Sequence, residues 1–115
     1  MSEHDDRLPM HQMLEHAREA VEMTRGRART ELPTNRMLQL ALVHLVQVVG
    51  EAASRVSRAG QARHPEIPSG KAITTRHRMV HGYDRIDHDV VWDTIAEDFP
   101  PLVAALEQAL ALERD

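Results

Sequence analysis

Apolar residues recur at helical spacing along most of the chain, and this spacing predicts long helices. Over residues 8–25, Met10, Leu14, Ala17 and Val21 follow one another at steps of four, three and four. Such steps place all four side chains on one face of a helix. Gly26 is expected to end this helix, because glycine readily takes the backbone conformation that closes a helix.

Residues 34–56 form the strongest predicted helix, with Thr34 as its expected cap. Most of its polar positions, together with Arg58 just after it, share one stripe about 100° wide. They are Arg36, His44, Gln47, Glu51, Ser54, Arg55 and Arg58. A helix that is apolar around most of its girth lies at the centre of a bundle or is partly covered by another chain. Gly50 inside it costs about 1 kcal/mol relative to alanine. A close crossing by another helix would explain it, and so would evolutionary drift.

The next segment, residues 57–70, is predicted to be a loop, because two prolines and two glycines stand in a polar setting. Ser69 is expected to cap a third helix over residues 70–81 that ends at Gly82. No strand is predicted.

A fourth helix is predicted over residues 88–97, with Asp87 as its cap, and Pro100 and Pro101 interrupt it and begin a fifth. The expected buried face of the last helix consists of Leu102, Val103, Leu106 and Leu110. The sequence therefore predicts an all-α fold, an up-and-down bundle of four to five helices in a single domain spanning residues 1–115.

Composition narrows the function classes. The 115 residues contain no cysteine, which excludes disulfides and thiolate nucleophiles and fits a cytoplasmic protein. The acidic N-terminus does not resemble a signal peptide, and no uninterrupted apolar run reaches the roughly 18 residues of a membrane span. The net charge of −4 argues against a general nucleic-acid coat, so any contact with phosphate must be local.

Basic side chains are concentrated near "TTRHRMVHGYDRIDHD", residues 74–89. Between residues 70 and 85 the chain has four positive charges against the single acid Asp84. The positive side chains are Lys71, Arg76, Arg78 and Arg85.

Three interpretations of this cluster are open. His77 and His81 stand four residues apart, as zinc ligands do on a helix, but Arg78 occupies the place of the glutamate base that the zinc motif requires. The second is metal-free phosphodiester chemistry, in which arginine holds the phosphate and histidine moves a proton. The third is structural: cations near a helix end offset the carbonyl dipole.

One motif favours the second interpretation through a resemblance. Arg76, His81 and Tyr83 match R-x-x-x-x-H-x-Y, which is similar to the motif of the HepT-like family of HEPN-domain toxins. The stretches "MLQLALVHLVQVVGEAASRVS", "HPEIP", "RHRMVHGYDRIDHDVVWDTI" and "DFPPLVAALEQAL" resemble that family in order and spacing. The resemblance covers nearly the whole chain.

The resemblance implies a homodimeric, metal-independent endoribonuclease toxin that needs no cofactor, with a site in a cleft between protomers. Arg76 and His81 would be the catalytic pair, with His77 assisting. We expect further RNA contacts from the basic side chains Arg78, Arg85 and Lys71. On an ideal helix Arg76 and His81 lie about 140° apart, so one protomer's arginine could serve the other's histidine.

The resemblance also implies an antitoxin, a minimal nucleotidyltransferase of the MNT type that adenylylates Tyr83. The alternative is a catalytically inactive binding module of the same fold that pairs with such a nucleotidyltransferase. Ser69, Thr74 and Thr75 depart from the family's usual residues just before the motif.

Overall fold

The computed structural model describes residues 5–81 and 85–112, and for Val80 and His81 the backbone only. Its long helices are α1 (Arg7–Thr24), α2 (Arg36–Ser54), α4 (Ser69–Arg78) and α6 (Phe99–Leu112). The shorter elements are the 3₁₀ turn η1 (Arg29–Thr34), α3 (Arg58–Arg63), the strands β1 (Val80–His81) and β2 (Arg85–Ile86), α5 (His88–Asp93) and the π-helical η2 (Thr94–Asp98).

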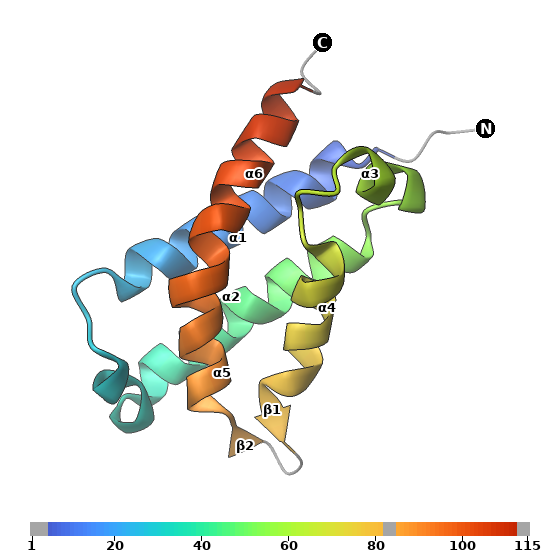
Figure 1. The fold of residues 1–115 in the computed structure, drawn as a ribbon. Helices are drawn as coiled ribbons and strands as arrows, with labels where there is room; N and C mark the ends of the chain where they lie inside the picture. The colour runs from blue at the N-terminus through green and yellow to red at the C-terminus, as the bar shows by residue number, and fades with distance from the viewer. Residues whose placement is uncertain (1–4, 82–84, 113–115) are drawn as a thin grey trace.

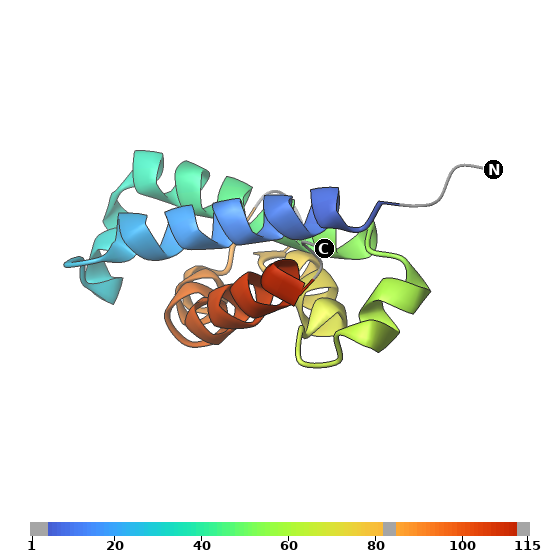
Figure 2. The same cartoon turned by 90° about the horizontal axis from the view of Figure 1, so that it is seen from above.

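The helices form two layers (Figures 1 and 2). α1 and α2 lie side by side in one layer, while α4 and the continuous rod of α5, η2 and α6 form the other. α1 packs on α2 and on α6, and α2 packs on α4. This arrangement confirms the predicted all-α fold class.

Apolar stripes on the helices supply the core between the layers. Met10, Leu14 and Ala17 of α1 are buried, as the spacing predicts, and Val21 packs at the margin. From α6 the core receives Leu102, Leu106 and Leu110, while Val103 is half-buried beside them. The burial of these side chains removes apolar surface from water and is the main source of stability.

α2 is long and apolar enough to cross a membrane by length and composition alone, and half of its apolar window is buried inside the bundle. The other half includes the exposed side chains Met37 and Leu40, which are 82% and 52% exposed. Among the described residues, large exposed apolar side chains also occur at Leu8 and Leu112.

Of the five expected helix boundary residues, Gly82 lies outside the described residues, and two of the other four hold. α1 ends at Thr24, and Gly26 follows with φ +77°, a left-handed conformation that favours glycine. Asp87 caps α5, where its carboxylate accepts the Val90 N–H at 3.1 Å.

The other two caps were placed wrongly. The cap of α2 is Asn35 instead of Thr34, since the Asn35 side chain accepts the Leu38 N–H at 3.0 Å. Thr34 belongs to η1 and donates its hydroxyl to the Glu31 carbonyl. Ser69 is the buried first residue of α4, and Pro68 occupies the cap position.

Residues 57–70 are not all loop, because they contain the short helix α3. The Ser57 hydroxyl accepts the Gly60 N–H at 3.0 Å and so caps the first turn of this helix. Pro65, Pro68 and Gly70 all follow α3. The polar composition of residues 58–63 gave no apolar spacing from which this short helix could be predicted.

The third helix is shorter than predicted. α4 ends at Arg78, and Val80–His81 pairs antiparallel with Arg85–Ile86, which contradicts the expectation that no strand would form. The Met79 carbonyl accepts the Asp87 N–H at 2.7 Å, so the hairpin takes an acceptor that a longer helix would use.

Pro100 and Pro101 lie within the first turn of α6 and do not break the rod. Proline lacks an N–H and cannot donate to the carbonyl four residues back. The chain accommodates this in η2, where the Phe99 N–H donates to the Thr94 carbonyl five residues back.

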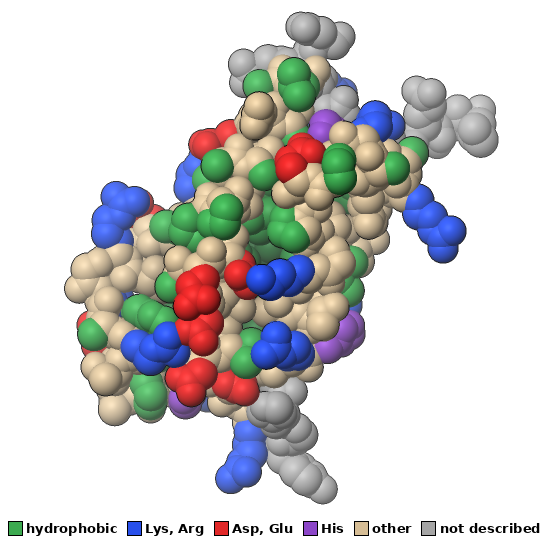
Figure 3. All heavy atoms as spheres, viewed as in Figure 1, with side chains coloured by type: hydrophobic (Ala, Val, Ile, Leu, Met, Phe, Trp, Pro, Cys, Tyr) green, Lys and Arg blue, Asp and Glu red, His purple; other side chains and the backbone are tan. Residues whose placement is uncertain are grey.

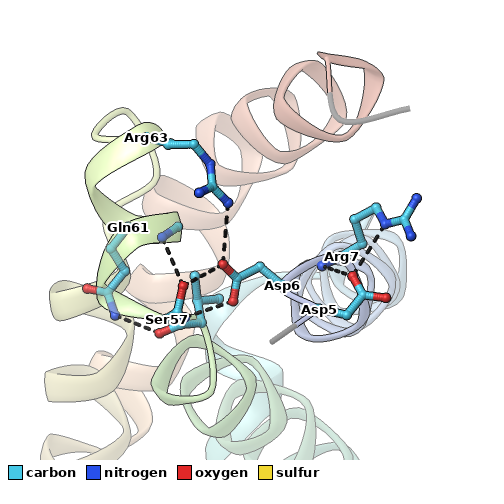
Figure 4. Close-up of polar contacts among 8 residues, drawn as sticks. Asp5, Asp6, Arg7, Ser57, Gln61 and Arg63 are labelled. Atoms are coloured by element: carbon cyan, nitrogen blue, oxygen red, sulfur yellow. Dashed lines mark hydrogen bonds and ion pairs between the residues drawn. The ribbon is translucent and has the colours of Figure 1, made fainter. Parts of the chain in front are cut away.

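A buried carboxylate ties the start of α1 to the start of α3 (Figure 4). Asp6 is 6% exposed and accepts the Ser57 N–H at 2.8 Å and the Ser57 hydroxyl at 2.6 Å. Arg63 approaches the same carboxylate at 3.6 Å. Gly60 leaves the space that this carboxylate occupies, because a Cβ there would lie 2.1 Å from Asp6 Oδ2.

We expect Asp6→Ala to lower the free energy of unfolding by about 1–3 kcal/mol, because it leaves the partly buried Ser57 N–H and hydroxyl without their acceptor. Urea denaturation followed by circular dichroism measures the change. Asp5→Ala is the control, since Asp5 is exposed and bonds Arg7 at the surface; we expect less than about 0.5 kcal/mol there. Equal losses in the two variants would contradict a structural role specific to Asp6.

Candidate functional site

Arg76 borders a groove between α2 and α4, which we call the α2–α4 groove. Its volume is about 340 Å³, and it is lined by His44, Gln47, Val48 and Glu51 of α2 and Arg76 of α4. Arg76 is half-buried, while His44, Gln47 and Glu51 are exposed. The groove therefore presents a cation, an imidazole, an amide and a carboxylate to solvent.

Gly50 determines how closely α4 approaches α2. A Cβ at Gly50 would lie 2.9 Å from the Ala72 carbonyl oxygen and 2.9 Å from the Arg76 Cβ. Real side chains essentially never make contacts this short, so only glycine permits the approach. This contact explains the glycine inside α2 as the predicted close helix crossing, and it sets the start of the Arg76 side chain against α2.

The last turn of α4 carries three basic side chains, Arg76, His77 and Arg78. His77 and Arg78 are exposed, and within residues 5–81 and 85–112 no carboxylate forms an ion pair with any of the three. Their position also offsets the carbonyl dipole of the helix end, typically by 0.3–1 kcal/mol per charge. The same side chains therefore serve both the interpretation in which cations offset the helix dipole and the one in which they bind phosphate.

His81 is separated from the helix that carries Arg76. It belongs to β1 and pairs with Arg85 of β2, while its side chain and all of Tyr83 lie outside the described residues. The angle of about 140° expected on an ideal helix therefore does not apply, because α4 ends at Arg78. Arginine and histidine of the motif are presented by a helix and a hairpin.

Lys71 and Arg85 do not line the α2–α4 groove. Lys71 forms an ion pair with Asp98 at 2.9 Å and so links α4 to η2. Arg85 is exposed and lines a separate surface hollow of about 480 Å³ with Pro33, Ile86 and residues 87–89.

Acidic and basic side chains alternate on the face seen in Figure 3. Arg29 of η1 bonds Asp93 and, at 3.0 Å, Asp89, and these bonds raise the pKa of its guanidinium. The Arg29 and Lys71 charges are each matched by α5 or η2 carboxylates. These paired cations are therefore poor candidates for a phosphate site, whereas Arg76 in the α2–α4 groove has no carboxylate partner among the described residues.

Metal ligation was one interpretation of the histidine cluster. Across the described part of the chain, no group of three or more histidine, aspartate or glutamate side chains converges to hold a metal ion. His44 also borders a second hollow of about 290 Å³ with His16 and Glu19 of α1, without forming such a group.

His44 and Gln47 were recognised in the sequence only as members of a polar stripe. Their spacing from Glu51 predicts one helix face, but nothing in the sequence states which helix lies beside that face. Gly50 was the available signal, because a glycine on the border of a polar stripe marks a close neighbour there.

The fold and the groove define a class of protein, an all-α bundle in which a cationic side chain faces a polar groove between two packed helices. A family model described as "Ribonuclease HepT-like" matches residues 13–109. The chain belongs to this HepT-like, HEPN-type family.

Named relatives agree with the family model. "Probable ribonuclease HepT" of Thermococcus cleftensis is 29% identical over 99 residues, covering 83% of this chain and 90% of the relative. "Putative RNase MJ1380" of Methanocaldococcus jannaschii is 25% identical over 107 residues, covering 93% and 98%. No solved structure matches the chain significantly.

Replacing Gly50 with alanine should push α4 away from α2, because the new methyl group meets backbone as well as side chain. We expect Gly50→Ala to lower the free energy of unfolding by about 1–3 kcal/mol, the usual cost of overpacking. Gly70→Ala is the matched control, since no atom lies within 4 Å of its Cβ position. Alanine there should be neutral or stabilise α4 by up to about 1 kcal/mol. Denaturant midpoints measure both; a neutral Gly50→Ala would refute the tight crossing.

Proposed function

We propose that the protein is a metal-independent endoribonuclease, the toxin of a type II toxin–antitoxin pair, acting in the cytoplasm. Membership of the HepT-like ribonuclease family supports RNA as the substrate. The observation that carries the proposal is the placement of Arg76 at the α2–α4 groove, half-exposed and without an ion-pair partner among the described residues.

In the proposed reaction Arg76 holds the scissile phosphate and stabilises the charge that develops on its oxygens. His81 takes the proton from the ribose 2′-OH, and the 2′-oxygen forms a bond to phosphorus. The bond from phosphorus to the 5′-oxygen breaks, and that oxygen receives the proton, with His77 assisting. The products are a 2′,3′-cyclic phosphate and a 5′-hydroxyl, and no metal is required.

We propose that the working form is a homodimer, as the family resemblance implies. The exposed apolar side chains Met37 and Leu40 support this, because they lie on the solvent side of α2. A second copy would cover them and bring its own motif to the cleft, while the polar end of α2 stays open to RNA.

The partner in this proposal is an MNT-type nucleotidyltransferase that adenylylates Tyr83. The added phosphate brings bulk and negative charge beside the cationic cluster, which would exclude and repel RNA. RNA contacts outside the groove would come from Arg78, Arg85 and Lys71. The ion pair of Lys71 with Asp98 would have to open for this contact.

Arg76→Ala and His81→Ala should each reduce RNA cleavage at least 100-fold, because one removes the phosphate clamp and the other the proton carrier. Cleavage of a labelled RNA in excess EDTA measures the effect, with growth inhibition in cells as a second assay. Arg58→Ala is the control, since Arg58 lies on α3 away from the groove. Full cleavage by both motif variants would refute the assigned catalytic pair. Wild-type toxicity of both variants, with no RNA cut by the purified wild type, would leave the alternative, a binding module that pairs with the nucleotidyltransferase.

Incubation with the nucleotidyltransferase, ATP and magnesium should add AMP to the peptide that contains Tyr83, as measured by mass spectrometry. Tyr83→Phe should gain no mass and should stay toxic when the partner is present. Modification of another peptide, or no mass gain in the wild type, would refute this part of the proposal without touching RNA cleavage.

A further inference from the structure

The α2–α4 groove contains side chains that phosphate binding does not require. His44, Gln47, Val48 and Glu51 stand at steps of three, one and three, which places them on one face of α2. The Glu51 carboxylate repels phosphate in the same groove as Arg76, so binding of an anion alone makes no use of it. A ligand complementary to both side chains offers an anion to Arg76 and hydrogen-bond donors to Glu51.

A nucleotide meets both demands, with a phosphate at one end and a base edge at the other. On the basis of the proposed ribonuclease function, we propose that the α2–α4 groove binds the nucleotide beside the scissile phosphate and selects guanine as its base. Arg76 contacts the phosphate, His44 stacks on the base, and Glu51 accepts hydrogen bonds from the base edge.

His44 is suited to stacking because its ring is exposed on the rim of the groove. Single-stranded RNA is commonly held by bases stacked on aromatic or histidine rings. Aromatic residues make up only 3% of this chain, and none of the described Trp92 and Phe99 side chains lines the groove. Val48 adds an apolar contact on the groove wall.

Glu51 is suited to base selection because an ionised carboxylate accepts hydrogen bonds and donates none. Guanine presents two neighbouring donors on its Watson–Crick edge, N1–H and the N2 amino group. Adenine and cytosine each present one amino group beside an acceptor, and uracil presents one N–H between two acceptors. Two parallel bonds to a carboxylate are therefore available from guanine alone.

The preference should be moderate. Glu51 is 55% exposed, and its ion pair with Arg55 is long, at 3.5 Å, so little is lost when the carboxylate turns to a base. A well-formed bidentate contact discriminates by about 10-fold or more, and exposure to water keeps this site at the lower end. Gln47 can donate and accept, so it adds contact without selecting one base.

Binding of RNA that cannot be cut tests this assignment separately from catalysis. The probes are four fluorescent 2′-O-methyl tetranucleotides, UGUU, UAUU, UCUU and UUUU, whose blocked 2′-oxygen cannot attack the phosphate. Anisotropy titrations give the dissociation constant of each probe with wild type and variants. We expect wild type to bind UGUU about 10-fold more tightly than UUUU.

The variants separate base reading from simple charge. Glu51→Gln should bring UGUU and UAUU within about threefold, because an amide can pair with the mixed edge of adenine. Glu22→Gln is the matched control, because it removes the same charge from an exposed acid of α1. Glu22 forms an ion pair with Arg25, as Glu51 does with Arg55. His44→Ala should weaken all four probes roughly 10-fold, and His44→Phe should restore them.

Three results would overturn the assignment. They are equal binding of all four probes by wild type, an equal gain for all probes in Glu51→Gln, and unchanged binding in His44→Ala. If wild type selects guanine but cuts no RNA, the base site stands and the proposed nuclease function fails. If wild type cuts RNA but binds all four probes equally, the proposed nuclease function stands and the base site fails.

Discussion

The contact between α2 and α4 at Gly50 is the constraint on which the candidate site depends. The absence of a side chain lets the Ala72 carbonyl and the Arg76 Cβ come against α2. As a result, one arginine of the basic cluster faces the polar stripe of the neighbouring helix instead of open solvent.

α2 combines three different surfaces along and around its axis. One side supplies core residues such as Leu42, Val46 and Val49. The solvent side is apolar near its start, at Met37 and Leu40, and polar further on, at His44 and Glu51. This division allows the proposed protomer contact and the proposed RNA groove to lie on one helix without competing for the same turns.

The sequence predicted the helices well, because apolar spacing depends only on which face is buried. The Asp87 cap was predictable because it depends only on local sequence, a single side chain and the turn that follows it. The end of α4 was not, because the Asp87 N–H that occupies the Met79 carbonyl lies eight residues further along the chain. Asn35 and Thr34 are both good caps, and local sequence could not rank them.

The candidate site was predicted in part. Arg76 was recognised from the motif, His77 from its place beside Arg76, and Glu51 from the polar stripe, but the placement of Arg76 and His44 in one groove requires knowing which helices cross. Lys71 appeared as a free cation in the sequence, whereas it contacts Asp98 from a distant segment. Such tertiary ion pairs leave no periodic trace in a sequence.

The central claim is that Arg76, held against α2 by the crossing at Gly50, binds the phosphate of an RNA strand in the α2–α4 groove. A crystal structure with a non-cleavable 2′-O-methyl oligonucleotide tests this directly. The account predicts a phosphate within hydrogen-bonding distance of the Arg76 guanidinium and a base beside His44. An RNA strand bound elsewhere, with the groove closed by protein, would contradict it.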